Sequence, residues 1–201
     1  MQVASRPLWK AMGSSQGASG PGRIFVLATA LVLVALSCAA VVQGQPTGNR
    51  DHPLPRVDRL VARKAAHELE AWSGGRLVRT YRVAIGAGGA GPKAFEGDGR
   101  TPEGRYSIDS RHRSSSFHRF LHISYPNAED RRRHREARRR GQVPRGRGIG
   151  GDVGIHGEAR GIAGIFAPLV DWTAGCIAVS DEEIEELYAA VRPGAPIEIL
   201  P

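Results

Sequence analysis

Residues 171–179 read Asp-Trp-Thr-Ala-Gly-Cys-Ile-Ala-Val, and His156 lies upstream in the sequence Gly-Ile-His-Gly. A cysteine and a histidine, each beside a glycine, are the parts of a thiol nucleophile and its base. The simplest alternative is a structural cysteine, because cysteine is among the most buried residue types. Thr173 and Gly175 argue against that alternative, since both suit a tight turn whose backbone N–H groups point at a reacting oxygen. We therefore interpret Cys176 as a nucleophile and His156 as its base.

The spacing of these residues resembles that of a known enzyme family. Sixteen residues separate His156 from Thr173, which begins the sequence Thr-Ala-Gly-Cys. This resembles the signature of the YkuD-type L,D-transpeptidases, which is a histidine, a spacer of this size and then Ser/Thr-His-Gly-Cys. Residues 97–106 read Gly-Asp-Gly-Arg-Thr-Pro-Glu-Gly-Arg-Tyr, similar to the family block Gly-Asp-x-x-Thr-Pro-x-Gly-x-Tyr. The resemblance runs from about residue 57 to residue 200.

Two positions depart from the family pattern. The histidine that is common two residues before the cysteine is Ala174 here, and the Asn or Arg often found two residues after it is Ala178. No second histidine is therefore available in this turn, and we expect His156 to carry the base role alone.

The resemblance implies a mostly β, β-sandwich-like catalytic fold with Cys176 and His156 in one groove. It implies that Cys176 attacks the third residue of a peptidoglycan stem peptide, a diamino acid such as meso-diaminopimelate. D-Ala then leaves, and an amine takes the acyl group from the thioester. It also implies that carbapenems acylate Cys176 and that the carbonyl of Gly157 orients the imidazole. We expect the N–H groups of Cys176 and Gly175 to hold the oxyanion. Thr173 either donates a hydrogen bond to the sulfur or the substrate, or caps the turn.

Other functions remain open at this point. Water in place of the amine gives an L,D-carboxypeptidase or an endopeptidase, which trims stems or cuts wall-protein links with the same Cys–His pair. A wall-linked protein is likewise an open choice of partner and acceptor. The missing histidine at Ala174 is the one feature that favours a non-catalytic wall-binding module, and the intact Cys176 and His156 argue against it. A sortase also uses cysteine and histidine, but the downstream arginine typical of sortases is not evident.

The chain of 201 residues divides into three expected segments. Residues 1–44 are an export signal, a lipoprotein signal or an N-terminal membrane anchor, because the uncharged run 24–42 follows basic residues. Cys38 ends an Ala-Leu-Ser-Cys sequence that resembles a lipoprotein cleavage site, where the cysteine becomes lipidated. Residues 45–55 form a linker, and residues 56–201 form the catalytic domain. Each alternative places that domain in the cell envelope, in the periplasm or on the outer face of the membrane.

Positive charge is concentrated in one stretch of the chain. The formal net charge is +8, and residues 131–147, the arginine segment, hold nine arginines and one glutamate. Such a density suits phosphates, but no aromatic residues interleave the arginines and an exported protein rarely meets nucleic acid. We therefore expect no nucleic-acid partner. We also expect no metal or cofactor, because Cys176 is the only cysteine outside the targeting segment and no metal-binding or phosphate-loop motif is visible.

Hydrophobic periodicity predicts a mostly β domain with a C-terminal helix. That helix begins at Ser180, which forms a capping box with Glu183, and ends before Pro193. Asn127 caps a second predicted helix that runs through the arginine segment to Gly141 without an apolar stripe. The family has a lid over the groove at this place in the chain order. Strands are expected at residues 64–72, 77–85, 104–108, 121–125, 153–156, 176–179 and 196–200.

The remaining candidates receive structural interpretations. Trp172 is interpreted as a packing residue beside the turn, and Asp171 as a turn former rather than a partner of His156. Arg100 and Glu103 are expected to form an ion pair. The other histidines are expected to be structural or exposed, namely His52, His67, His112, His118, His122 and His134.

Overall fold

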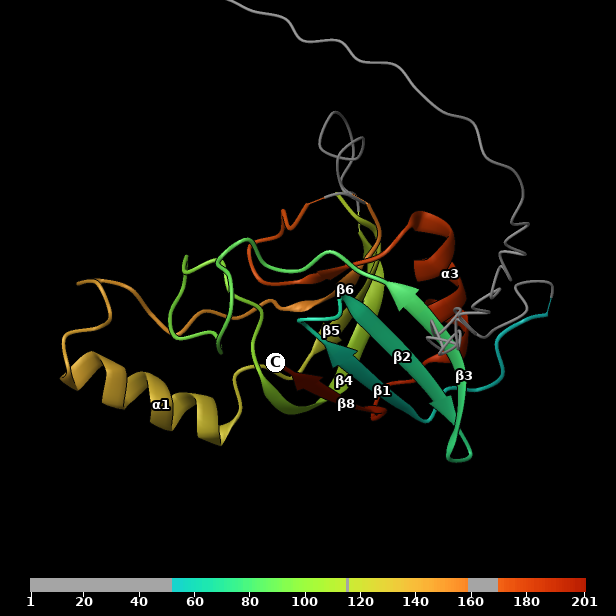
Figure 1. The fold of residues 1–201 in the computed structure, drawn as a ribbon, viewed down its shortest axis with the longest axis horizontal. Coiled ribbons are helices and arrows are strands. Elements are labelled where there is room, and N and C mark those ends of the chain that lie inside the picture. Colours follow the sequence, from blue (N-terminus) through green and yellow to red (C-terminus); the bar gives the residue numbers. More distant parts are fainter. Residues whose placement is uncertain (1–51, 115, 159–169) are drawn as a thin grey trace, which may run out of the picture. The chain divides into compact units, whose positions relative to one another are not determined.

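The protein is described by a computed structural model over residues 52–114, 116–158 and 170–201. In this part of the chain, eight strands form one sheet in the order β3-β2-β1-β8-β4-β5-β6-β7 (Figure 1). The strands are β1 (Arg59–Arg63), β2 (Glu68–Ser73), β3 (Arg76–Arg82), β4 (Gly104–Ser114), β5 (His118–Ile123), β6 (Gly154–His156), β7 (Ile177–Ala178) and β8 (Pro196–Leu200). The mostly β fold predicted from the sequence is confirmed.

Strands β1, β2, β3 and β8 form the first half of the sheet. The hairpin of β2 and β3 turns at Gly74 and Gly75, whose φ angles of 56° and 77° suit a two-residue hairpin turn. β1 pairs antiparallel with β2 and parallel with β8, so the last strand of the chain lies beside the first.

Strand β4 joins the two halves of the sheet. Its first residues, from Gly104 to Ser107, pair with β8, and from Ile108 onward it pairs with β5. The register with β5 shifts between Ile108 and Ser110, which is a bulge, and bulges bend a strand and increase its twist. The sandwich-like fold is therefore one curled sheet whose halves share β4.

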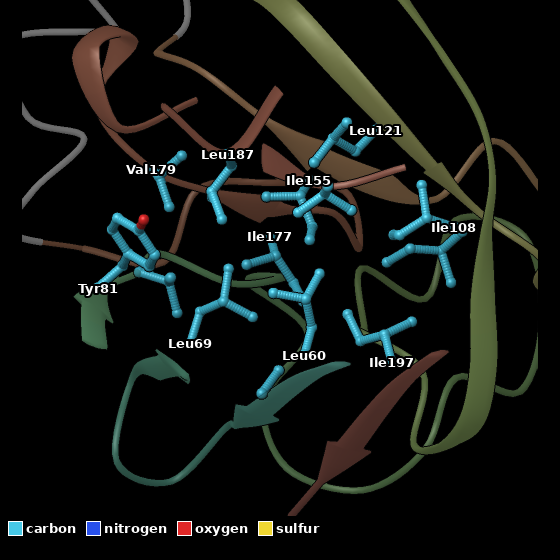
Figure 2. Close-up of a cluster of buried hydrophobic side chains, with 14 of the residues drawn as sticks. Leu60, Leu69, Tyr81, Ile108, Leu121, Ile155, Ile177, Val179, Leu187 and Ile197 are labelled. Carbon is cyan, nitrogen blue, oxygen red and sulfur yellow. The ribbon is translucent and has the colours of Figure 1, made fainter. Parts of the chain in front are cut away.

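The two halves enclose one apolar core (Figure 2). Leu60 and Leu69 reach it from the first half, and Leu121 and Ile155 from the second, each at 0% exposure. Burying a side chain of this size stabilises a fold by about 1.5–3 kcal/mol relative to its exposure to water. This core fixes the strands that carry the site.

Helix α3 (Asp181–Ala190) begins as predicted, with the capping box of Ser180 and Glu183. Ile184 and Leu187 are fully buried, and the helix packs against β5 and β6. The predicted C-terminal helix is confirmed, and it packs against β6, the strand that carries His156.

Helix α1 (Ala128–Arg139) forms where the sequence predicted it, capped by Asn127. Asp130 is buried and accepts hydrogen bonds from Arg133 and from the Tyr106 hydroxyl at 3.1 Å. The helix is thus attached by polar contacts along its first half, where Arg133 also donates to the Glu103 carbonyl and His134 Nδ1 lies 2.8 Å from the Ala94 carbonyl. Its C-terminal end extends away from the strands in Figure 1. That the arginine segment acts as a lid stays a prediction.

Some boundaries differ from the prediction. β1 was not predicted, because its Leu-Val-Ala centre is buried without a break and so lacks alternation. β4 continues to Ser114, well past residue 108, and residues 64–67 form a turn instead of a strand. The targeting segment and most of the linker lie outside the described residues. In the part that is described, no helix is long and apolar enough to cross a membrane.

Candidate active site

Two adjacent parallel strands bring Cys176 and His156 to the same face of the sheet. β6 pairs with β7 so that Ile155 lies opposite Ile177 and His156 opposite Ala178. Ile155 and Ile177 point into the core. Because side chains alternate along a strand, Cys176 and His156 both point to the opposite face.

The imidazole of His156 is enclosed by aromatic rings. Phe117 stacks on it with ring centroids 4.2 Å apart, Trp172 meets it edge-on at 5.6 Å and Phe120 stacks at 5.9 Å. His156 is 1% exposed, and its Nδ1 lies 2.7 Å from the carbonyl oxygen of Gly157. Since that carbonyl can only accept, Nδ1–H is the donor and Nε2 is left to accept a proton.

Burial sets the protonation state of His156. It lowers the pKa of the imidazole below the usual value, although the hydrogen bond to Gly157 opposes the shift. The ring is therefore neutral at pH 7. A neutral imidazole with a free Nε2 is the form that a general base requires.

The thiol of Cys176 is half-buried and carries its proton at pH 7. Burial raises the pKa of the thiol, opposed by the Gly154 N–H and by the Lys93 ammonium, while Asp152 raises it further. The sulfur also lies 3.6 Å from the Asp152 carbonyl oxygen, within hydrogen-bonding range for S–H. A protonated thiol on the same face as a neutral imidazole favours proton transfer during attack over a preformed ion pair.

Threonine hydroxyls shape the turn that presents Cys176. Thr173 Oγ1 donates to the Cys176 carbonyl at 2.7 Å and accepts from the Gly175 N–H at 3.2 Å. Of the two roles expected for Thr173, the structure shows the cap. The Gly175 N–H is already engaged inside the turn, which counts against it as an oxyanion donor. Cys176 N–H remains as the donor expected from the sequence.

Gly175 has no room for a side chain. Its φ is +137°, and a carbon added to its Cα would lie 2.7 Å from the carbonyl oxygen of Arg100. Gly154 is equally constrained, since an added carbon would lie 2.2 Å from the Phe120 ring. These two glycines let the strands and the turn pack as closely as the site requires.

A buried ion pair lies beneath the turn, and sequence reasoning did not identify it. Asp98 accepts from the N–H groups of Ala94, Phe95 and Arg100 and from the Lys93 ammonium at 2.8 Å. Burial alone would raise the pKa of this carboxyl, but Lys93 and the three N–H groups bring it below its usual value. Asp98 belongs to the block at residues 97–106, so that motif was the available signal.

The expected ion pair between Arg100 and Glu103 is wrong. Arg100 donates to the carbonyl of Gly88. Glu103 pairs instead with the buried Lys64 at 2.7 Å, because the turn after β1 places the Lys64 ammonium beside this carboxylate.

Asp171 binds neither its own turn nor His156. It accepts from the Ile85 N–H at 2.9 Å and contacts His67 Nε2 at 3.1 Å, so His67 has a specific partner that its sequence context did not indicate. Trp172 packs beside His156 as expected. No group of three or more His, Cys, Asp or Glu residues suited to a metal ion occurs within the described ranges.

A thiol and a neutral imidazole on one face of a sheet are the two groups that a cysteine nucleophile site requires. A profile of the YkuD family, the L,D-transpeptidase catalytic domain, matches residues 57–199, and the chain belongs to that family. The Escherichia coli (strain K12) protein named "Putative L,D-transpeptidase YafK" is 27% identical over 135 residues. That match covers 63% of this chain and 45% of YafK, so the chain spans about half the length of this relative.

Two solved structures are similar to this chain at low sequence identity. L,D-transpeptidase 3 from Mycobacterium tuberculosis, in complex with a faropenem-derived adduct, has a TM-score of 0.48 at 17% identity, covering 73% of this chain and 61% of that one. The helical cell shape determining protein Pgp2 from Campylobacter jejuni has a TM-score of 0.48 at 19% identity, covering 76% of this chain and 51% of that one.

Proposed function

We propose that the protein is a cell-envelope L,D-transpeptidase that works through a thioester on Cys176. The observation that carries this proposal is the placement of a protonated thiol and a neutral, buried imidazole on one face of a YkuD-family domain. The proposed donor is a peptidoglycan stem peptide, and the proposed leaving group is its D-alanine.

In the first half-reaction, Nε2 of His156 takes the thiol proton as Sγ attacks the carbonyl carbon of the third stem residue. The Cys176 N–H donates to the oxyanion, and one such donor contributes about 2.7–4 kcal/mol in a well-studied protease. The imidazolium then gives its proton to the amine of D-alanine. The C–N bond breaks, and a thioester to Cys176 remains.

In the second half-reaction, an acceptor amine attacks the thioester carbon. His156 removes the proton from the attacking nitrogen, the C–S bond breaks, and the proton returns to the sulfur. The Gly157 carbonyl, at 2.7 Å from Nδ1, holds the ring in one orientation throughout both halves.

Aromatic packing supports the role proposed for His156. Phe117, Phe120 and Trp172 keep water from most of the ring, so the imidazole meets the substrate only at its free nitrogen. We also propose that residues 1–44 deliver the domain to the envelope, by export, by membrane anchoring or by lipidation at Cys38.

Purified tetrapeptide muropeptides provide the test. The protein should release D-alanine from them and, with an amine acceptor present, form the exchanged product detected by mass spectrometry. Products with water in place of the amine would instead identify a hydrolase. A lack of any product would contradict the proposal.

A further inference from the structure

Lys93 is a buried charged side chain that the proposed mechanism does not use. Its side chain is 4% exposed, and its Nζ lies 2.8 Å from Oδ1 of Asp98, whose side chain is 6% exposed. Lysine is almost never fully buried unless it is paired. A buried pair is weak evidence for stability, because removing two ions from water offsets their attraction. Its position therefore calls for another explanation.

Lys93 lies between the two loops that deliver the thiol and the imidazole. A carbon added to Gly175 would lie 3.6 Å from Lys93 Nζ, and Gly175 directly precedes Cys176. A carbon added to Gly150 would lie 3.4 Å from Lys93 Cε, and Gly150 is in the loop that leads to β6. The absence of side chains at both glycines lets the lysine reach this place.

The ammonium end of the pair lies beside the turn that carries the nucleophile, since Lys93 Nζ is among the three atoms nearest to a carbon added to Gly175. The carboxylate of Asp98 is held by three backbone N–H groups in its own loop. Burial raises the pKa of Cys176, and the charged groups that act on it are Lys93, which lowers it, and Asp152, which raises it. The Asp98 carboxylate is held within its own loop, so the ammonium is the member of the pair next to the Gly175 turn.

We propose that Lys93 is a positioning residue for the nucleophile, whose fixed ammonium beneath the Gly175 turn stabilises the negative charge that forms on the Cys176 sulfur. Asp98 holds the ammonium in place before the reaction starts, and such prearranged charges need no reorganisation when charge develops. The catalytic consequence rests on the proposed function, but the effect on the thiol does not.

The test removes both charges together, in Lys93→Met with Asp98→Asn, so that no unpaired buried charge remains. Alkylation of Cys176 by iodoacetamide is followed across pH in the full chain, by mass spectrometry of the peptide that contains Cys176, because Cys38 also reacts. We expect the pKa of the thiol to rise by about one unit, which lowers the thiolate fraction about tenfold. The alkylation rate should fall only about threefold, since a more basic thiolate is a better nucleophile.

A second buried pair supplies a matched control. Lys64 and Glu103 lie 2.7 Å apart with side chains 5% and 15% exposed, and Lys64 also donates to the backbone carbonyls of Gly91 and Thr101. Lys64→Met with Glu103→Gln should change the melting temperature by a similar amount and leave the alkylation profile unchanged. If the first double variant does not fold, Lys93→Gln removes the charge while an amide still donates to Asp98.

An unaltered alkylation profile in a folded Lys93 variant would overturn the inference, and so would equal shifts in both double variants. If the wild-type protein showed no activity on muropeptides, the proposed function would fail. The dependence of the thiol on Lys93 would still stand or fall by the alkylation data alone.

Discussion

At the scale of single residues, the protonation of the site follows from what surrounds each group. The aromatic rings around His156 remove water from the imidazole, and the Gly157 carbonyl compensates only part of that loss. Burial also removes water from the thiol of Cys176 and raises its pKa, and the Lys93 ammonium opposes part of that rise. Both groups therefore rest in their neutral forms, and the charge separation is left to the reaction itself.

The neutral resting state has a spectroscopic consequence. Because burial lowers the pKa of His156 and raises that of Cys176, the thiol keeps its proton through neutral pH and loses it only above its ordinary value. The thiolate ultraviolet absorbance, taken as the difference between wild type and Cys176→Ala, should appear only on the alkaline side of pH 9. A full thiolate signal at pH 7 would indicate a preformed ion pair and contradict this account.

Removing either half of the pair should stop turnover. We expect Cys176→Ala and His156→Gln each to reduce kcat by at least about a thousandfold, because the two side chains act as one chemical unit. The measurement is D-alanine release from muropeptides. His134→Gln is a matched control. His134 lies on helix α1 and, like His156, contacts a backbone carbonyl, that of Ala94. We expect this variant to keep the wild-type rate of turnover. Turnover near the wild-type rate in Cys176→Ala would exclude the thioester route.

The sequence predicted Cys176 and His156 as a candidate pair from their spacing. It did not indicate the residues that only the fold brings together. Cys176 and His156 stand at a fixed separation beside glycines, so they were recognisable. Lys93 and Asp98 lie five positions apart in one loop. The block at residues 97–106 marks Asp98, but no local pattern indicates that the pair reaches the turn before Cys176. His67 and Asp171, which are 104 positions apart, illustrate the same limit.

At the scale of elements, close packing of β6 depends on Gly154. A carbon at this position would lie 2.2 Å from the Phe120 ring and 2.6 Å from the Leu121 carbonyl, and the second of these is backbone that cannot turn aside. Gly154→Ala should destabilise the fold by about 1–3 kcal/mol, the usual cost of overpacking. Denaturant unfolding measures this change.

Gly151 gives the matched control for that substitution. It lies three residues earlier, and an added carbon there has nothing within 4 Å. Gly151→Ala should leave the free energy of unfolding within about 0.5 kcal/mol of wild type. Equal effects of the two substitutions would mean that Gly154 is not specifically constrained.

Helix α1 divides into an anchored start and an exposed end. Asp130→Asn should lower the free energy of unfolding by about 1–3 kcal/mol, because it weakens a buried acceptor for Arg133 and Tyr106 as well as the capping box. Arg138, Arg139 and Arg140 are exposed, so changing all three to Gln should leave the melting temperature unchanged.

The same triple substitution tests the role of the arginine segment. We expect weaker and less salt-sensitive binding to isolated sacculi, since the attraction between exposed charges is screened by salt. A large loss of melting temperature with unaltered binding would contradict this expectation and assign the segment to the fold.

The elements themselves were predictable where a period or a cap is strong. The capping boxes at Ser180 and Asn127 fixed the starts of both helices, and the alternation of β8 marked the closing strand. β1 was not predicted, because it is a central strand whose consecutive residues are buried. Such a run does not alternate between apolar and polar residues.

At the scale of the whole molecule, the site depends on the curl of a single sheet. β8 pairs with both β1 and β4, and β4 then continues into the half that carries β6 and β7. Local sequence patterns do not predict the order in which distant strands pair. Periodicity predicted a mostly β domain and the family resemblance implied a sandwich-like arrangement, but only the structure shows how the two halves connect.

The whole site should also react with a carbapenem. We expect one covalent adduct by intact-mass analysis in the variant Cys38→Ser, because the remaining thiol is the activated one. The adduct should disappear when Cys176→Ala is added. An adduct that persists in the double variant would show that another group is the nucleophile.

The most direct test of the central claim is to trap the acyl-enzyme formed from a stem peptide. The protein is mixed with a tetrapeptide muropeptide, quenched rapidly in acid and digested, and the peptide that contains Cys176 is weighed by mass spectrometry. We expect that peptide to carry the stem without its D-alanine, as a thioester that an added amine removes. Free D-alanine released without any acyl group on Cys176 would contradict the account.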